Sequence, residues 1–328
     1  MNKDKIHFSG IMNKKSENMP LLSFILPAWK SRYLKEAIQS IVTQTYPNWE
    51  LVVVDDCSPD SLRTIVESFD NSRIRYYRNS FNIGKNNLVQ QWNHSISFAK
   101  GDYIILAADD DLYRPTFCEE IVRLANKYPQ VDLIHSSVEQ IDEDSHHLWD
   151  DNILPEFTNK YEYLNWWLTG RVFTCVGNFA FKRSALEALG GFIDYPCGFG
   201  SDIATPISLS LHGVANTQEM LFCFRQSPQH LSADTSRFKE KLEGTSRLLE
   251  FFRTIHYEEP DNSRDKEFYS IVNETYLQKK CVYDYFNLVV KYVPITELFS
   301  FLKLCRMATP GDKIMMILRW IKVRIIKR

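Results

Sequence analysis

Between residues 21 and 137, apolar runs alternate with segments whose apolar residues recur at helical spacing. This alternation restricts the chain to few folds. Strands that alternate with helices at this spacing predict βαβ units and therefore a mostly parallel sheet. In such sheets, ligands bind beyond the carboxyl ends of the strands. The apolar runs predicted to be strands are 21–27, 50–56, 73–79, 102–108 and 131–137.

After residue 137 the pattern changes. Residues 139–152 are acidic and are predicted to form a loop, and 161–171 are a candidate aromatic helix. Residues 198–213 predict a loop followed by a helix with Pro206 in its first turn. We therefore predict three parts, which are a flexible tail (1–19), a catalytic domain (20–235) and a helical region (236–328).

Composition narrows the class of protein. A formal net charge of -2 gives no general attraction to nucleic acid. The seven cysteines are scattered without a CxxC pair, which favours reduced thiols of a cytosolic protein. The first 19 residues lack an apolar core, and there is no apolar run of 18 residues. We therefore expect a cytoplasmic protein without a signal peptide or a membrane-spanning helix.

Three adjacent carboxylates, Asp109, Asp110 and Asp111, follow the fourth predicted strand. One aspartate there would suit a polar turn and a helix N-cap. Three like charges cost stability unless something neutralises them, so we favour a cation site. Mg²⁺ and Mn²⁺ accept such hard oxygen ligands, while substrate phosphates fill their other positions.

Asp55 and Asp56 close the second predicted strand in "VVVDDCSPD". A carboxylate at this position can accept hydrogen bonds from a nucleotide base or a ribose. The alternative is an Asx-type turn formed with Ser58 and Pro59. Taken alone, the pair slightly favours the turn.

Several motifs in order resemble glycosyltransferase family 2 over about residues 20–230. They are "FILPAWK", "SIVTQTYPNWELVVVDDCSPD", "NIGKNN" with "WNHSISFAKGDYI", and "AADDDLYRP". The resemblance implies a GT-A fold, which is Rossmann-like with a mostly parallel sheet, here with a C-terminal helical extension. It also implies an inverting, metal-dependent transferase with a nucleotide-sugar donor, for which a UDP-sugar is favoured. The Gln-x-x-Arg-Trp motif of processive members is absent, so we expect transfer of a single sugar to a saccharide acceptor in surface polysaccharide or glycan biosynthesis.

The resemblance also implies roles for the donor-binding residues. Pro27 and Ala28 would line the base with backbone groups. Asp55 or Asp56, with Asp56 favoured, would bond the uracil edge. Lys85 and Asn87 lie in the segment that reaches the base and phosphates.

For the aspartate triplet, the resemblance implies that Asp109 approaches the ribose and that Asp110 is the main metal ligand, with Asp111 close behind. The common family pattern is Asp-x-Asp-Asp, and Ala108 replaces its first aspartate here. This departure leaves open which of the three carboxylates binds ribose and which binds Mn²⁺ or Mg²⁺.

The family places a catalytic base, usually within a Glu-Asp pair, at the start of a later helix. In "GFGSDIATPISLSL", Ser201 replaces the glutamate and Asp202 remains. An N-cap is the alternative role for Asp202. With the resemblance, Asp202 is predicted to deprotonate the acceptor hydroxyl. Arg225 and His230, in "FRQSPQHLS", would contact the donor diphosphate, and a surface loop is an equally good alternative.

The C-terminal segment 311–328 contains six cations, and Ile314, Leu318, Ile321 and Ile325 fall on one helical face. Such a helix can lie in the interface of a membrane with anionic lipid. Packing on its own domain is an equally good alternative. Peripheral attachment to the inner face of the cytoplasmic membrane would suit a lipid-linked acceptor.

Two other functions fit parts of the sequence. A sugar-phosphate nucleotidyltransferase normally needs a glycine-rich phosphate loop after the first strand, and "PAWKSRYLKEAI" has no glycine. A catalytically inactive sugar-binding or scaffold protein of the same fold is compatible with Ala108 and Ser201. The retention of Asp56, Asp110 and Asp202 together argues against it.

Overall fold

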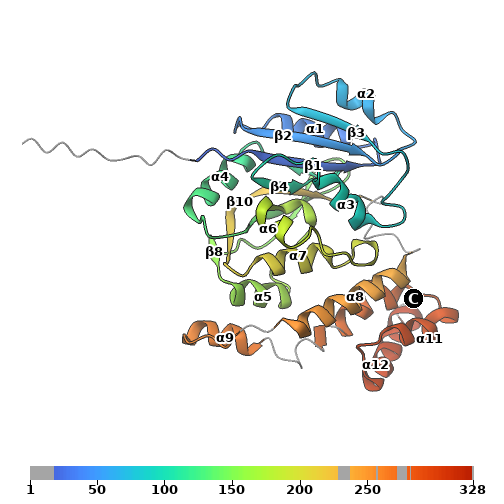
Figure 1. The fold of residues 1–328 in the computed structure, drawn as a ribbon. Coiled ribbons are helices and arrows are strands. Elements are labelled where there is room, and N and C mark those ends of the chain that lie inside the picture. Colours follow the sequence, from blue (N-terminus) through green and yellow to red (C-terminus); the bar gives the residue numbers. More distant parts are fainter. Residues whose placement is uncertain (1–17, 228–236, 256–257, 272–278, 281, 327–328) are drawn as a thin grey trace, which may run out of the picture.

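A computed structural model of the chain describes residues 18–227, 237–255, 258–271, 279–280 and 282–326. Residues 1–17 of the predicted tail, and His230, lie outside the described residues. The described chain forms one mixed sheet with helices on both faces and a group of helices below it (Figure 1).

Four neighbouring strands in the order β3-β2-β1-β4 are parallel and make up one half of the sheet. They are β1 (Leu22–Ala28), β2 (Trp49–Asp55), β3 (Ile74–Arg78) and β4 (Tyr103–Leu106). β3 and β4 lie within the runs predicted from the sequence, β1 ends one residue later than predicted, and β2 begins and ends one residue earlier. β1 and β2 are almost entirely buried because both faces of this half are covered.

The other half of the sheet mixes directions. β9 (Phe179–Lys182) runs antiparallel between β4 and β6 (Leu133–Ile141), and β10 (Val214–Arg225) is parallel to β6. Three short strands pair antiparallel with these two long ones. They are β5 (Leu112–Tyr113) and β8 (Phe157–Thr158) on β10, and β7 (His147–Asp150) on β6.

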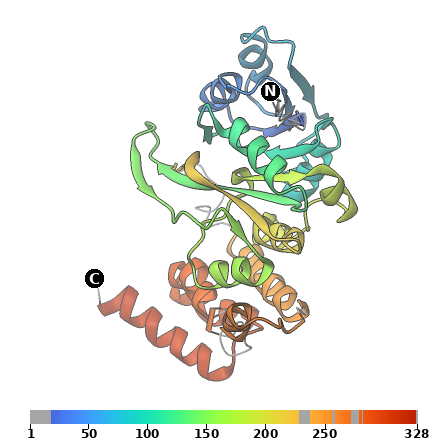
Figure 2. The same cartoon turned by 90° about the vertical axis from the view of Figure 1, so that its left-hand side faces the viewer.

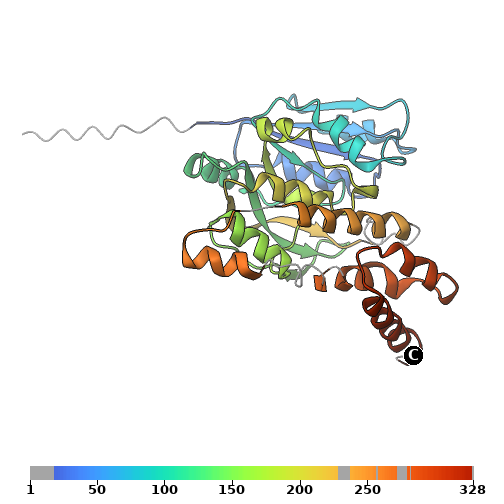
Figure 3. The ribbon, with the colours of Figure 1, turned by 60° about the horizontal axis from the view of Figure 1, so that its bottom comes forward.

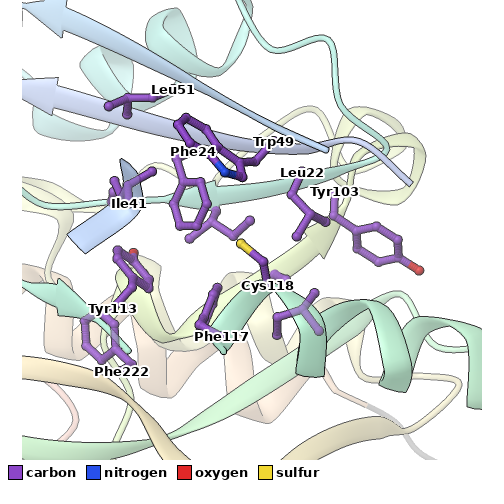
Figure 4. Packing of buried hydrophobic residues seen from close by; sticks show 14 of the residues in the cluster. Leu22, Phe24, Ile41, Trp49, Leu51, Tyr103, Tyr113, Phe117, Cys118 and Phe222 are labelled. Atoms are coloured by element: carbon purple, nitrogen blue, oxygen red, sulfur yellow. The ribbon is translucent and has the colours of Figure 1, made fainter. Parts of the chain in front are cut away.

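Two hydrophobic clusters lie on opposite faces of the sheet. Helices α1 (Leu34–Val42), α2 (Leu62–Glu67) and α4 (Phe117–Lys127) cover one face. Figure 4 shows part of this cluster, where the Tyr113 ring lies 5.0 Å from Phe24 and 4.8 Å from Phe117 between centroids. The other face is covered by α3 (Leu88–Ile96), α5 (Lys160–Leu168), α6 (Arg183–Ala188) and α7 (Ser201–Leu209).

Two predictions from the sequence were wrong in detail. The acidic stretch 139–152 is not a loop, because β6 continues to Ile141 and pairs with β7 in a hairpin that stands out from the body (Figure 2). Pro206 lies well inside α7 rather than in its first turn, because the helix begins at Ser201. Proline has no N–H to donate, so Pro206 leaves the Asp202 carbonyl without its helical partner.

The C-terminal region is helical, as predicted. α8 (Phe238–Thr254) packs on α7, and α9 (Ser263–Ile271) packs on α5. α11 (Ile295–Leu304) and α12 (Pro310–Ile321) form a third hydrophobic cluster with one side of α8. Met316 and Trp320 of α12 are buried in this cluster, while the end of α12 points away from the body (Figures 2 and 3). Among the described residues, no helix is long and apolar enough to cross a bilayer.

Candidate active site

The carboxyl ends of β1 and β4 meet through Asp109. Its Oδ2 accepts hydrogen bonds from the backbone N–H groups of Trp29, at 3.1 Å, and Lys30, at 2.9 Å. Both donors follow Pro27 and Ala28 directly, so the segment predicted to line the base is held against the aspartate triplet. Burial raises the pKa of Asp109 despite these two bonds.

Asp110 lies between the partly buried Asp109 and the buried Asp111, and it is itself partly buried. Burial and the neighbouring Asp109 charge raise the pKa of Asp110 to about 6, although Lys30 and Arg225 lower it. A carboxylate in this setting gains from a nearby cation, which favours its ionised form. The like-charge crowding that the sequence indicated is thus present at this turn, and the cation site remains a prediction.

Asp111 faces inward and is buried. Its Oδ1 accepts a 2.9 Å hydrogen bond from the backbone N–H of Arg225 at the end of β10. Burial, followed by the Asp110 charge, raises the pKa of Asp111 well above its usual range. This bond attaches the aspartate turn to the second half of the sheet.

The Arg225 side chain is fully buried behind the triplet. Nε donates to the Asp110 carbonyl at 2.8 Å, and Nη2 donates to the Glu36 carboxylate at 2.9 Å. Nη1 donates to the Glu143 carbonyl at 3.0 Å and to Oγ of Ser145 at 2.9 Å. In this conformation the guanidinium holds the turn, α1 and the β6–β7 hairpin together. It is not accessible to a diphosphate, contrary to the role expected from the sequence.

Asp55 is also completely buried. Oδ1 accepts from the backbone N–H of Ser58 at 2.7 Å, and Oδ2 accepts from the Tyr76 hydroxyl and the Arg78 guanidinium. The bond to Ser58 is the Asx-type turn that the sequence offered as the alternative. Asp55 therefore stabilises the end of β2, which leaves Asp56 as the candidate for contact with a base.

Asp56 holds the loop that follows β3. Oδ1 accepts from the backbone N–H of Ile83 at 2.8 Å, and Oδ2 accepts from that of Gly84 at 2.7 Å. A Cβ on Gly84 would lie 3.0 Å from Oδ2, so the close approach suits glycine. A base that reaches Asp56 would bind beside this loop.

The two loop residues predicted to contact the donor differ in their surroundings. The Lys85 side chain is exposed at the surface of the loop. Asn87 caps α3, where Oδ1 accepts from Gln90 N–H at 3.0 Å, and its Nδ2 donates to Asp194 at 2.6 Å. Lys85 is thus the more accessible of the two.

Asp202 lies in the first turn of α7, two residues after the left-handed Gly200. Burial raises the pKa of Asp202 to about 7, although backbone groups of Asp202 and Gly200 lower it. A carboxyl with this pKa can accept a proton near neutral pH, as a general base must.

Cys175 lies within electrostatic range of both Asp111 and Asp202, which the sequence did not reveal. Burial raises the pKa of the Cys175 thiol, and the Asp111 and Asp202 charges raise it further. No local pattern marks Cys175, because its position depends on contacts between distant parts of the chain.

Trp29 is a second residue that the sequence reasoning missed. Its indole is 46% exposed, and its backbone is fixed by bonds to Asp109 and Ser58. An exposed aromatic two residues after Pro27 is a signal that could have been used. A flat ring here offers a stacking surface for a base.

The three aspartates could bind a divalent ion only if a substrate supplied the remaining ligands. Among the described residues, no three His, Cys, Asp or Glu side chains form a group that could hold a metal ion. Mg²⁺ is commonly held by one or two carboxylates plus substrate phosphates rather than by a complete protein cage. Asp110, buried among like charges, suits that arrangement, with the nearby oxygens of Asp109 and Asp111.

The fold and its carboxylates define an α/β protein whose candidate ligand site lies at the carboxyl edge of parallel strands. The sequence matches the family described as "Glycosyl transferase family 2" over residues 23–190, just over half of the chain. The chain belongs to glycosyltransferase family 2.

Curated relatives align with part of the chain. An uncharacterised glycosyltransferase of Rickettsia typhi is 34% identical over 138 residues, which cover 42% of this chain and 42% of the relative. A protein of Escherichia coli K12, named as the colanic acid biosynthesis glycosyl transferase WcaA, is 37% identical over 102 residues, or 30% of this chain and 36% of the relative. The chain thus spans less than half the length of each of these relatives.

Solved structures show the same fold. TarS 1-349 of S. aureus in complex with UDP-GlcNAc has a TM-score of 0.69 at 14% identity, covering 92% of this chain and 83% of that one. The mannosyltransferase PcManGT of Pyrobaculum calidifontis, in complex with GDP-Man and Mn²⁺, has a TM-score of 0.53 at 17% identity, covering 95% and 89%. This likeness confirms the predicted GT-A fold.

Proposed function

We propose that the protein is an inverting, metal-dependent glycosyltransferase that moves one sugar from a nucleotide-diphosphate sugar to a hydroxyl of a saccharide acceptor. The observation that carries this proposal is the crowding of Asp109, Asp110 and Asp111 at the carboxyl edge of the parallel strands, fixed by hydrogen bonds to the end of β1 and to Arg225, in a chain of glycosyltransferase family 2. A turn that could bind a cation and a carboxyl with a pKa of about 7 are the two groups that this reaction requires.

Asp202 would act on the acceptor. Its ionised carboxylate takes the proton from the acceptor hydroxyl as the oxygen attacks the anomeric carbon. The bond from that carbon to the diphosphate oxygen breaks as the new bond forms, so a single displacement inverts the configuration. Burial raises the pKa of the Asp202 carboxyl to about 7, which makes it a stronger base than an exposed aspartate.

The aspartate turn and the β1 end would bind the donor. Asp110, with Asp111 and Asp109 beside it, would hold a Mn²⁺ or Mg²⁺ ion, which when bound neutralises charge on the diphosphate leaving group. The Trp29 ring, the Asp56 carboxylate and the backbone of Pro27 and Ala28 border the side where a base would lie.

A UDP-sugar is the favoured donor, and surface polysaccharide synthesis is the favoured context. UDP-GlcNAc is bound to TarS, which shares the fold, whereas GDP-Man is bound to PcManGT. WcaA is named for colanic acid biosynthesis. These relatives support a nucleotide-sugar donor and a saccharide acceptor as the substrate classes.

The C-terminal helix supports contact with a membrane surface and thus a lipid-linked acceptor. Met316 and Trp320 fix one side of α12 in the third hydrophobic cluster. On another side, Ile314, Leu318 and Ile325 are 58%, 53% and 57% exposed. Lys313, Arg319, Lys322 and Arg324 lie among these apolar residues, which matches an anionic interface.

The decisive experiment measures nucleoside-diphosphate release from a panel of nucleotide sugars with Mn²⁺, Mg²⁺ or EDTA. We expect metal-dependent release from one UDP-sugar, accelerated by a saccharide acceptor, and a product of inverted anomeric configuration by NMR. Donor binding without any release or transfer would instead favour the inactive sugar-binding protein. Retention of configuration would reject the proposed displacement.

A further inference from the structure

Three aromatic rings form a row beside the candidate active site. The Phe224 and Phe173 centroids are 5.1 Å apart, and the Phe173 and Trp149 centroids are 6.2 Å apart, both with edge-to-face geometry. Trp149, at the outer end, is 42% exposed on the β6–β7 hairpin. Phe173 and Phe224 are partly buried, so the row leads from solvent toward the interior.

The strand register puts the two ends of the row on one face of the sheet. Trp149 of β7 lies opposite Gln140 of β6, and Gln140 lies opposite Phe224 of β10. Directly paired residues project to the same face. Gln226, two residues beyond Phe224, donates to Oε1 of Gln140 and remains exposed, so polar amide groups accompany the rings.

The inner end of the row is attached to the aspartate turn. Phe224 directly precedes Arg225, whose backbone N–H is bonded to Asp111. Phe173 precedes Cys175 by two residues, a chain distance of at most about 7 Å. The Phe173 N–H donates to Asp151 at 2.6 Å, so the hairpin itself positions this ring.

We propose that Trp149, Phe173 and Phe224 form the platform on which the saccharide acceptor binds. This inference rests on the proposed function and extends it, because the location of the acceptor was left open. Sugars present apolar C–H faces that suit aromatic rings, while their hydroxyls require polar partners such as Gln226. Because the inner end of this platform adjoins Arg225 and, through it, Asp111, an acceptor bound there lies beside the aspartate turn.

The test compares Trp149→Ala and Trp149→Phe with Leu148→Ala, a matched control. Leu148 is equally exposed on the same strand, but it neighbours Trp149 in sequence and therefore projects to the other face. The acceptor probes are p-nitrophenyl hexosides, offered with the UDP-sugar that the protein hydrolyses. We expect Trp149→Ala to raise the acceptor KM tenfold or more, with donor hydrolysis and Tm unchanged. Trp149→Phe should recover most of the loss, and Leu148→Ala should match the wild type.

An acceptor KM that is unchanged in Trp149→Ala would overturn the platform while leaving the proposed function intact. If the wild type hydrolyses no donor, the proposed function fails, and the platform is then tested by binding alone. Quenching of tryptophan fluorescence by the same glycosides should be weakened in Trp149→Ala. Equal quenching in both proteins, or no glycoside binding at all, would reject the platform.

Discussion

The backbone N–H of Arg225 donates to Oδ1 of Asp111 at 2.9 Å, and the Arg225 side chain donates to the carbonyl of Asp110 at 2.8 Å. One residue at the end of β10 is thus hydrogen-bonded to two successive aspartates. The geometry of the aspartate turn therefore depends on a strand more than a hundred residues away in the sequence.

We expect Arg225→Met to lower stability rather than to weaken nucleotide binding selectively. The substitution removes the hydrogen bonds of the buried guanidinium to the Asp110 and Glu143 carbonyls and to the Glu36 carboxylate, which costs on the order of 3 kcal/mol. Thermal unfolding would show a Tm several degrees lower. The exposed Arg63→Met, which removes an α2 ion pair with Glu67, is the control and should change Tm little. A stable Arg225→Met protein that cannot bind UDP would instead support the diphosphate contact expected from the sequence.

Asp202→Asn should separate binding from catalysis. Asparagine keeps the shape of the side chain but cannot accept the acceptor proton, so the transfer rate should fall by about 10² to 10⁴-fold. UDP affinity, measured by calorimetry with Mn²⁺, should be unchanged. Asp144→Asn on the exposed hairpin is a matched control that should retain full activity. Wild-type rates in Asp202→Asn would remove this residue as the base.

The pH dependence of kcat/KM should report Asp202. The base must be ionised, and with a pKa of about 7 the rate should fall about tenfold per pH unit below pH 7 and level off above it. The contribution of Asp202 to the free energy of unfolding should instead fall as pH rises. An aspartate whose pKa is raised by folding favours the native state in its neutral form, so this contribution is lost as pH rises toward 7. Asp202→Asn should therefore gain more in Tm at pH 8 than at pH 5. A pH-independent Tm difference would contradict the raised pKa.

Asp110→Asn should abolish the effect of metal on nucleotide binding. In the wild type, Mn²⁺ together with UDP should raise Tm more than either alone, because ligands of the native state stabilise it. The variant should lose this joint effect. Without ligands, it should be at least as stable as the metal-free wild type. Above pH 6 its free energy of unfolding should exceed that of the metal-free wild type, because the Asp110 charge that burial disfavours is removed. A joint Mn²⁺ and UDP effect that survives in Asp110→Asn would shift the ligand role to Asp109 or Asp111.

Leu318→Glu should weaken binding to vesicles rich in phosphatidylglycerol. The residue is exposed on α12, so the folded protein should tolerate the change, while the added charge opposes insertion. Co-sedimentation should show a fall of tenfold or more, and Leu211→Glu, exposed elsewhere, should have no effect. Point variants are better than truncation before α12, because Met316 and Trp320 belong to the third hydrophobic cluster. Equal vesicle binding by Leu318→Glu and the wild type would exclude this helix as the membrane contact.

The alternation of apolar runs and amphipathic segments predicted the parallel half of the sheet correctly, because strand and helix periodicity are local properties. It also placed Asp55, Asp56 and the triplet at strand ends. The later strands were harder to predict, because β7 is fully exposed and carries no apolar pattern. Its pairing with β6 depends on a partner that only the folded chain provides.

The sequence by itself determined the fold class, the family and the identity of the candidate carboxylates, because these depend on residue type and local spacing. Tertiary structure decided what each polar group does. Asp55 and Asp56 are adjacent and both buried, yet one accepts from Tyr76 and Arg78 at the end of β2 while the other holds the loop after β3. Arg225, which the sequence offered as a diphosphate ligand, instead binds Asp110 and Asp111 through buried hydrogen bonds. Such roles follow from burial and from partners distant in the sequence, which local patterns do not encode.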